Sequence, residues 1–187
     1  MKLKSVFHMF MLIALFTFLS TAMAQEKKAS DSEYSIDAKT AFERWHAAPD
    51  KIKILDVRTT GEYVFVGHAP MAYNIPFLFF AQEWNNEKEK YNMPANEDFV
   101  AEVKKKFRTT DTIFVMCRSG SRSAKSIQLL KEAGFKYLYN IEDGFEGTTL
   151  KMEDSYNNGQ RIVNGWKNSG SPWTYSLDPE LVYNPKH

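Results

Sequence analysis

Cysteine and runs of basic residues are both scarce in this sequence of 187 residues. It has one cysteine, and its longest basic run is Lys104–Lys106. One cysteine excludes an internal disulfide, and a formal net charge of +1 gives no reason to expect nucleic acid as a partner. The four histidines lack a mutual spacing suited to a metal ion, so we expect neither a metal site nor a cofactor. Internal repeats are also absent.

The first 24 residues have the pattern of a secretory signal peptide. Lys2 and Lys4 precede an apolar stretch over residues 6–19, and Ala22–Ala24 supplies small residues at the two positions that signal peptidase recognises. We predict cleavage after Ala24, which would make the mature protein periplasmic or secreted, with no stable membrane association. An uncleaved anchor is the alternative, because the apolar region is nearly long enough to span a bilayer.

Short apolar runs alternate with amphipathic stretches between residues 38 and 141. Helices are expected at 38–48, capped by Asp37, then at 59–67, at 97–107 capped by Asn96, and from the Ser-rich segment after Cys117 to Gly134. Strands are expected at 52–57, 72–75, 112–116 and 137–141, and a polar loop at 85–97. This alternation predicts an α/β fold with a central, mostly parallel sheet and helices on both faces.

The remaining segments are assigned by their composition. Residues 25–34 are polar and are predicted to be a flexible lead-in to a domain over residues 35–175. Residues 148–165 are too long and too polar for an ordinary connection, so we interpret them as an insertion that serves as a lid, a partner surface or a plain loop. Residues 176–187 form a C-terminal tail, which we expect to pack across the surface.

The single thiol, Cys117, lies where an apolar run ends and a Ser/Gly/Arg-rich segment begins, in FVMCRSGSRSAKS. Reactive groups of open α/β sheets collect at the carboxyl ends of strands. The turn Arg118–Arg122 contains Gly120, so its backbone N–H groups can form an anion-binding nest, to which the following helix adds its positive end. These features stabilise a thiolate, which is the nucleophilic form, and also bind an anion. A buried bystander cysteine is the alternative, but it does not explain the two adjacent arginines.

Cys117 and Arg122, separated by four residues that include a glycine, resemble the active-site loop of the rhodanese family. The chain also resembles this family at Leu55–Arg58, at residues 67–76 (GHAPMAYNIP), at residues 143–147 (DGFEG), and at Trp166 with the Gly-Ser-Pro that follows it. Met71 and Asp143 stand where the family usually has glycine. The resemblance covers about residues 35–173 and implies a rhodanese-like fold with a five-stranded sheet.

The resemblance implies a sulfurtransferase without a cofactor. Cys117 would be the catalytic residue, taking sulfane sulfur from a small anionic donor such as thiosulfate and passing it to a thiol or cyanide acceptor. The residues expected to bind the substrate are Arg118, Ser119, Gly120, Ser121, Arg122 and Arg58. Arg118, at the tip of the loop, is expected to meet the donor's sulfonate, whereas Arg122 is expected to hold the loop by bonding to Asp56 or Glu62. Arg58 is expected to pair with Asp56 or to line the entrance.

Two other functions are open to the same loop. Related phosphatases have five residues between cysteine and arginine, because a phosphate needs a wider cradle, and the four residues here favour sulfur over phosphate. The second alternative is a carrier or redox-sensing module that has little turnover by itself and delivers sulfur to an exported partner protein.

Overall fold

The computed structural model describes residues 34–184 of the chain. The predicted signal peptide and nearly all of the predicted lead-in lie outside the described residues. The chain divides into two units, residues 1–35 and 36–187, and almost every described element belongs to the second. Among residues 34–184, no helix has the length and apolar character needed to cross a membrane.

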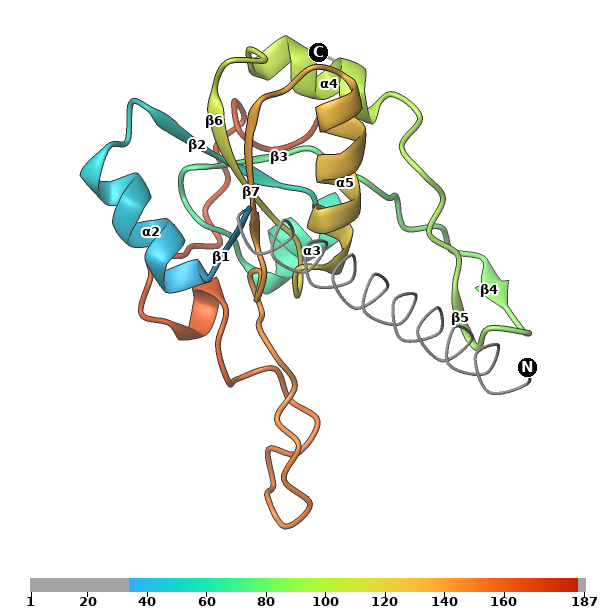
Figure 1. Cartoon of the computed structure of the whole chain (residues 1–187). Coiled ribbons are helices and arrows are strands. Elements are labelled where there is room, and N and C mark those ends of the chain that lie inside the picture. Colours follow the sequence, from blue (N-terminus) through green and yellow to red (C-terminus); the bar gives the residue numbers. More distant parts are fainter. Residues whose placement is uncertain (1–33, 185–187) are drawn as a thin grey trace, which may run out of the picture. The chain divides into compact units, whose positions relative to one another are not determined.

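A five-stranded sheet forms the centre of the second unit, with the strand order β1-β7-β6-β2-β3 (Figure 1). Its strands are β1 (Ser35–Ile36), β2 (Ile52–Asp56), β3 (Ala72–Asn74), β6 (Thr112–Met116) and β7 (Tyr137–Ile141). β2 pairs in parallel with both β3 and β6, and β6 pairs in parallel with β7. The predicted α/β class and the mostly parallel five-stranded sheet are therefore confirmed.

Helices cover both faces of the sheet, as the alternating pattern predicted (Figure 1). α4 (Phe99–Lys106) and α5 (Ser121–Glu132) lie on one face, while α2 (Ala38–Ala47), α3 (Thr60–Val66) and the 3-10 turn η1 (Trp166–Asn168) pack on the other. Successive side chains of a strand point to opposite faces. Along β6, Ile113 and Val115 therefore join the first core and Phe114 and Met116 the second. All four are buried, which explains why this run has no polar position.

The helix starts differ from the predictions at one position. Asp37 caps α2 by accepting a hydrogen bond from the Thr40 N–H at 2.9 Å, as predicted. α4 instead begins after Asp98, so the prediction of Asn96 as its cap is wrong. The Asn96 amide donates to the Pro76 carbonyl at 2.8 Å, and its oxygen accepts from the Asp98 N–H. Asn96 therefore ties the segment after β3 to the approach of α4.

The polar segment expected to be a loop contains a small hairpin. β4 (Trp84–Asn85) and β5 (Lys90–Tyr91) pair antiparallel in a separate two-stranded sheet. The Tyr91 ring contacts Trp84 and Phe80, with centroid distances of 5.4 and 5.2 Å. The three rings are about half exposed, so the hairpin has no buried side to give an alternating pattern in the sequence.

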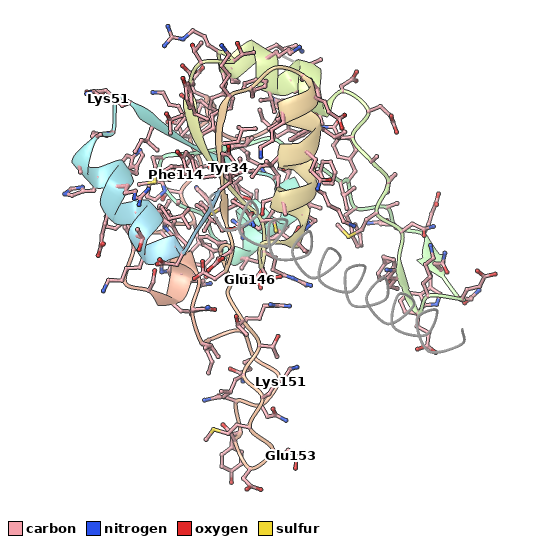
Figure 2. All side chains as sticks on the ribbon, in the orientation of Figure 1. Tyr34, Lys51, Phe114, Glu146, Lys151 and Glu153 are labelled. Atoms are coloured by element: carbon pink, nitrogen blue, oxygen red, sulfur yellow. The ribbon has the colours of Figure 1, made fainter. Side chains whose placement is uncertain are left out.

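The insertion at residues 148–165 extends from the carboxyl edge of the sheet (Figure 1). Figure 2 shows Glu146 where the chain leaves the sheet, with Lys151 and Glu153 farther along the insertion. Leu150 N–H donates to the Gln160 carbonyl at 2.8 Å, and Thr149 and Arg161 form an antiparallel bridge. The insertion therefore folds back on itself as an irregular hairpin.

The C-terminal segment lies along the free side of β3. His68 and Thr174 exchange two backbone hydrogen bonds of 2.9 and 2.8 Å, and the Asn74 N–H donates to the Leu181 carbonyl at 2.8 Å. The buried His68 ring stacks on Tyr63 and contacts the Ser176 carbonyl through Nε2 at 3.2 Å. The tail thus provides hydrogen-bonding partners at a sheet edge that would otherwise be open.

Candidate active site

The candidate site lies where two parallel strands send the chain in opposite directions. β2 continues through α3 to β3, whereas its neighbour β6 continues through α5 to β7 on the other side. The loops that leave β2 and β6 therefore diverge and leave room for a ligand at the carboxyl ends of the strands. Cys117 is the first residue after β6, which places the only thiol at this switch point.

The loop after Cys117 presents unused backbone donors. Gly120 has φ 88°, the left-handed conformation, and is the N-terminal cap of α5. Within residues 34–184, no hydrogen bond engages the backbone N–H groups of residues 118–122. Unused N–H groups beside the positive end of a helix can bind an anion or an electron-rich sulfur. Substrate binding by Ser119, Gly120 and Ser121 stays a prediction.

A second segment, residues 142–146, packs against the backbone of the cysteine loop, and we call this segment the clamp. Phe145 N–H donates to the Cys117 carbonyl at 2.8 Å, and Glu146 N–H donates to the Arg118 carbonyl at 3.0 Å. A side chain at Gly120 would collide with the Glu142 carbonyl, and one at Gly144 would lie 2.5 Å from the Cys117 carbonyl oxygen. Both glycines are therefore required by close backbone contact, and the shape of the loop depends on the chain after β7.

Asp143, which stands where the rhodanese pattern has glycine, anchors this clamp. Its carboxylate accepts 2.8 Å hydrogen bonds from the Ala38 N–H at the start of α2 and the Gly165 N–H before η1. Desolvation by burial raises the pKa of Asp143 above its ordinary value, although both hydrogen bonds act in the opposite direction. The departure from the family pattern therefore adds a link between the clamp and two distant segments.

Cys117 is almost fully buried, with an exposed fraction of 1%, and its sulfur has one side-chain hydrogen-bonding partner among residues 34–184. Ser123 Oγ lies 3.5 Å from Cys117 Sγ and 2.9 Å from the Gly120 carbonyl oxygen. The sequence alone does not single out Ser123, because a serine in the first turn of a helix is usually explained by capping. Its position as the third helical residue, facing back toward the loop, is the signal that could have identified it.

Glu62 and Arg122 join α3 to α5. The two guanidinium Nη atoms donate to the two carboxylate oxygens at 2.8 and 2.6 Å, while Glu62 also completes a capping box with Thr59. Burial alone would raise the pKa of Glu62, but the Arg122 hydrogen bonds and charge outweigh it and hold the pKa at about 2. The same pair raises the pKa of Arg122 against the effect of its burial. Of the two partners expected for Arg122, the geometry selects Glu62.

Arg58 does not take the substrate-binding position that the sequence allowed for it. Both Arg58 and Asp56 have fully buried side chains, and Arg58 Nη2 bonds to Asp56 at 2.7 Å and to the Gly67 carbonyl at 2.9 Å. Its guanidinium also lies 4.0 Å from the centre of the Phe145 ring. The predicted Asp56–Arg58 ion pair is therefore present, and Arg58 supports the segments around the site.

The other predicted site residues differ in exposure. Arg118 and Ser121 are exposed, Ser119 is partly buried and Arg122 is mostly covered. Arg118 is therefore the more exposed of the two loop arginines, and its contact with the donor stays a prediction. Residues 34–184 contain no cluster of three metal-ligating side chains.

Known proteins resemble the chain over much of its length. The family model for the Rhodanese-like domain matches residues 39–151. "Thiosulfate sulfurtransferase 16, chloroplastic" of Arabidopsis thaliana is 36% identical over 93 residues, which are 50% of this chain and 70% of that protein. "Putative sulfur carrier protein YrkF" of Bacillus subtilis is 29% identical over 130 residues, covering 70% of this chain and 57% of that protein.

A solved structure extends the similarity over most of the described fold. The crystal structure of Rv0390 from M. tuberculosis superposes with a TM-score of 0.60 and 26% sequence identity. The match covers 76% of this chain and 97% of that one.

Proposed function

The chain belongs to the rhodanese-like domain family, and we propose that it is a sulfurtransferase that carries sulfane sulfur as a persulfide on Cys117. The observation that supports this most strongly is the position of the lone thiol within the unused N–H donors of residues 118–122, at the start of α5. That arrangement stabilises both a thiolate and the outer sulfur of a persulfide.

In the loading step, the Cys117 thiolate attacks the sulfane sulfur of a donor such as thiosulfate. A bond forms between Cys117 Sγ and that sulfur, the sulfur–sulfur bond of the donor breaks, and its electron pair leaves with sulfite. Arg118, the exposed cation of the loop, is placed to attract the donor's sulfonate. The outer sulfur then lies among the loop N–H groups.

Intact-mass measurement after incubation with thiosulfate tests this function. The wild-type protein is expected to gain the mass of one sulfur atom and to lose it on addition of cyanide, whereas Cys117→Ser gains nothing. Absence of any gain in the wild type would overturn the proposal. Hydrolysis of an aryl phosphate would instead indicate a phosphatase, which the four-residue spacing between Cys117 and Arg122 disfavours.

A second candidate is a carrier that exchanges sulfur with a protein partner and turns over slowly with small acceptors. The near-complete burial of Cys117 favours it, because a buried sulfur is shielded from adventitious thiols. The similarity to a protein named as a putative sulfur carrier is consistent with it. Persulfide formation without turnover on cyanide or small thiols, restored by an exported partner, would distinguish this carrier from the enzyme.

Export of the protein is a separate proposal that rests on residues 1–24 of the sequence. It predicts that the mature protein begins at Gln25 and is recovered from the periplasmic or secreted fraction. N-terminal sequencing of the protein from each cell fraction tests this, and an intact Met1 on a membrane-bound form would support the uncleaved anchor instead.

A further inference from the structure

The hydroxyl of Ser123 lies between two acceptors of different character. It is 3.5 Å from Cys117 Sγ and 2.9 Å from the Gly120 carbonyl oxygen, and the residue is fully buried. A serine hydroxyl has one hydrogen, so it can donate to only one of these acceptors at a time. A thiolate is a charged acceptor and the carbonyl a neutral one, so the preferred partner depends on the state of the sulfur.

We propose that Ser123 is a catalytic residue whose hydroxyl donates to Cys117 Sγ when that sulfur is a thiolate and to Gly120 when it is part of a persulfide. This inference rests on the proposed sulfurtransferase function and deepens it. In the persulfide, Sγ is bonded to a second sulfur and carries no full charge, so it is the weaker acceptor. The Gly120 carbonyl, at the shorter distance, then takes the hydrogen.

This change of hydrogen-bond acceptor implies that Ser123 acts mainly in the discharge step. There an acceptor thiolate attacks the outer sulfur, a new sulfur–sulfur bond forms to the acceptor, and the bond to Cys117 Sγ breaks. The electron pair of that bond stays on Sγ, and the outer sulfur leaves on the acceptor with the negative charge that it has carried since loading. Negative charge therefore develops on Sγ, and the adjacent Ser123 hydroxyl stabilises it as the leaving group.

The loading step depends on Ser123 much less. A hydrogen bond to a thiolate favours that form over the thiol, but it also makes the thiolate a weaker nucleophile. These two effects oppose each other during loading. Loss of the hydroxyl should therefore slow discharge more than loading. General damage to the site would instead slow both steps alike.

Ser126 offers a matched control on the same helix. It is also fully buried, and its hydroxyl donates to the Ser123 carbonyl at 2.8 Å rather than to sulfur. Ser126→Ala therefore removes a buried hydroxyl and one hydrogen bond close to the loop while leaving the Ser123–Cys117 contact in place. Ser123→Thr retains a hydroxyl at the test position.

The experiment measures the two steps separately on the full chain, with the persulfide fraction followed by intact mass after rapid quenching. In Ser123→Ala, discharge to cyanide is expected to slow about tenfold and loading from thiosulfate by less than about threefold. Ser126→Ala should change neither step, and Ser123→Thr should restore discharge. Unchanged discharge in Ser123→Ala, equal slowing of both steps, or the same defect in Ser126→Ala would each overturn the assignment.

Alkylation of Cys117 by iodoacetamide gives a readout that needs no sulfur transfer. The rate at neutral pH is expected to be lower in Ser123→Ala than in Ser126→Ala by up to about threefold, because loss of the hydrogen bond disfavours the thiolate. At high pH the order should reverse, because a thiolate without that hydrogen bond is the stronger nucleophile. Equal rates at both pH values would overturn the hydrogen bond. Absence of a persulfide in the wild type, together with a clear alkylation difference, would reject the proposed function but keep the Ser123–Cys117 contact.

Discussion

Glu62 and Arg122 form a two-bond ion pair across the switch point of the sheet, between the helix that follows β2 and the helix that follows β6. Both side chains are mostly covered, with exposed fractions of 22% and 15%. The start of α5, which presents the donors around Cys117, is thus fixed to α3 by side chains as well as through the sheet.

Replacement of this carboxylate is expected to lower the stability of the fold. Glu62→Gln keeps one acceptor but leaves the Arg122 guanidinium without its counter-charge, so the free energy of unfolding should fall by about 1–2 kcal/mol. Urea unfolding measures this loss. The matched control is Glu102→Gln, which breaks a pair whose lysine is 64% exposed and should cause no measurable change. Equal losses in the two variants would contradict the bracing role of Glu62.

The same pair should make stability depend on pH in the acid range. The pKa of Glu62 is lowered from 4.5 to about 2 by folding, so its contribution is fully present above its unfolded pKa of 4.5. The contribution is lost as the pH falls from 4.5 toward 2, because the folded carboxylate becomes protonated. Thermal unfolding between these pH values should show a smaller decline in Glu62→Gln than in the wild type. A parallel decline in both would show that other carboxylates account for acid unfolding.

The contact of the clamp with the cysteine loop can be tested at Gly144. This glycine has φ 65°, and an added Cβ would lie 2.5 Å from the Cys117 carbonyl oxygen. Gly144→Ala should lower the free energy of unfolding by about 1–3 kcal/mol and reduce persulfide formation, although Gly144 has no side chain to contact a substrate. Gly61→Ala is the control, because a Cβ there meets nothing within 4 Å and a helical alanine should stabilise α3 by about 0.5–1 kcal/mol. Normal loading in Gly144→Ala would argue against the clamp.

A comparison of Arg118 with Lys125 can distinguish a specific contact with the donor from a general effect of positive charge. Both are exposed cations near the start of α5, but only Arg118 belongs to the loop. Arg118→Ala should raise the KM for thiosulfate about tenfold, because a charge-assisted contact to the sulfonate is lost. Lys125→Ala should change KM little. Steady-state kinetics at two salt concentrations checks this, and equal KM values for the two variants would assign the effect to long-range charge.

Arg58 is expected to matter for stability and not for donor affinity. Arg58→Met would leave the Asp56 carboxylate buried without its partner, at a cost of about 3–5 kcal/mol. Arg108→Met, at an 86% exposed side chain, is the matched control and should leave unfolding unchanged. If Arg58→Met folds normally and only raises the KM for thiosulfate, then Arg58 lines the entrance, as the sequence alone allowed.

The sequence predicts the main sheet because its central strand, β6, is buried on both faces over most of its length. The run Ile113–Met116 has no polar residue for this reason, and the helix on each side of it has a regular apolar stripe. The sequence left Asp56 and Glu62 as possible partners of Arg122, and it also allowed Arg58 to pair with Asp56. The structure shows both pairs, Arg58 with Asp56 and Arg122 with Glu62.

The features that were missed depend on long-range or weakly patterned contacts. The β4–β5 hairpin consists of exposed residues, and β1 is two residues long, so neither gives a periodic signal. Asp143 reaches Ala38 across 105 positions in the chain, which no local pattern encodes. The contact of Ser123 with sulfur became visible only in the structure, since a serine in the first turn of a helix has the same sequence signature whether it caps the helix or contacts the cysteine.

The C-terminal segment beside β3 has a consequence for how this protein can be shortened. The family model ends at residue 151, yet the Asn74 N–H at the β3 edge is paired with Leu181, and the buried Trp166 belongs to the core around α2. A chain cut at residue 151 would uncover a strand edge and an apolar cavity together. We therefore expect it to aggregate, which makes the minimal folding unit of this protein longer than the region that defines its family.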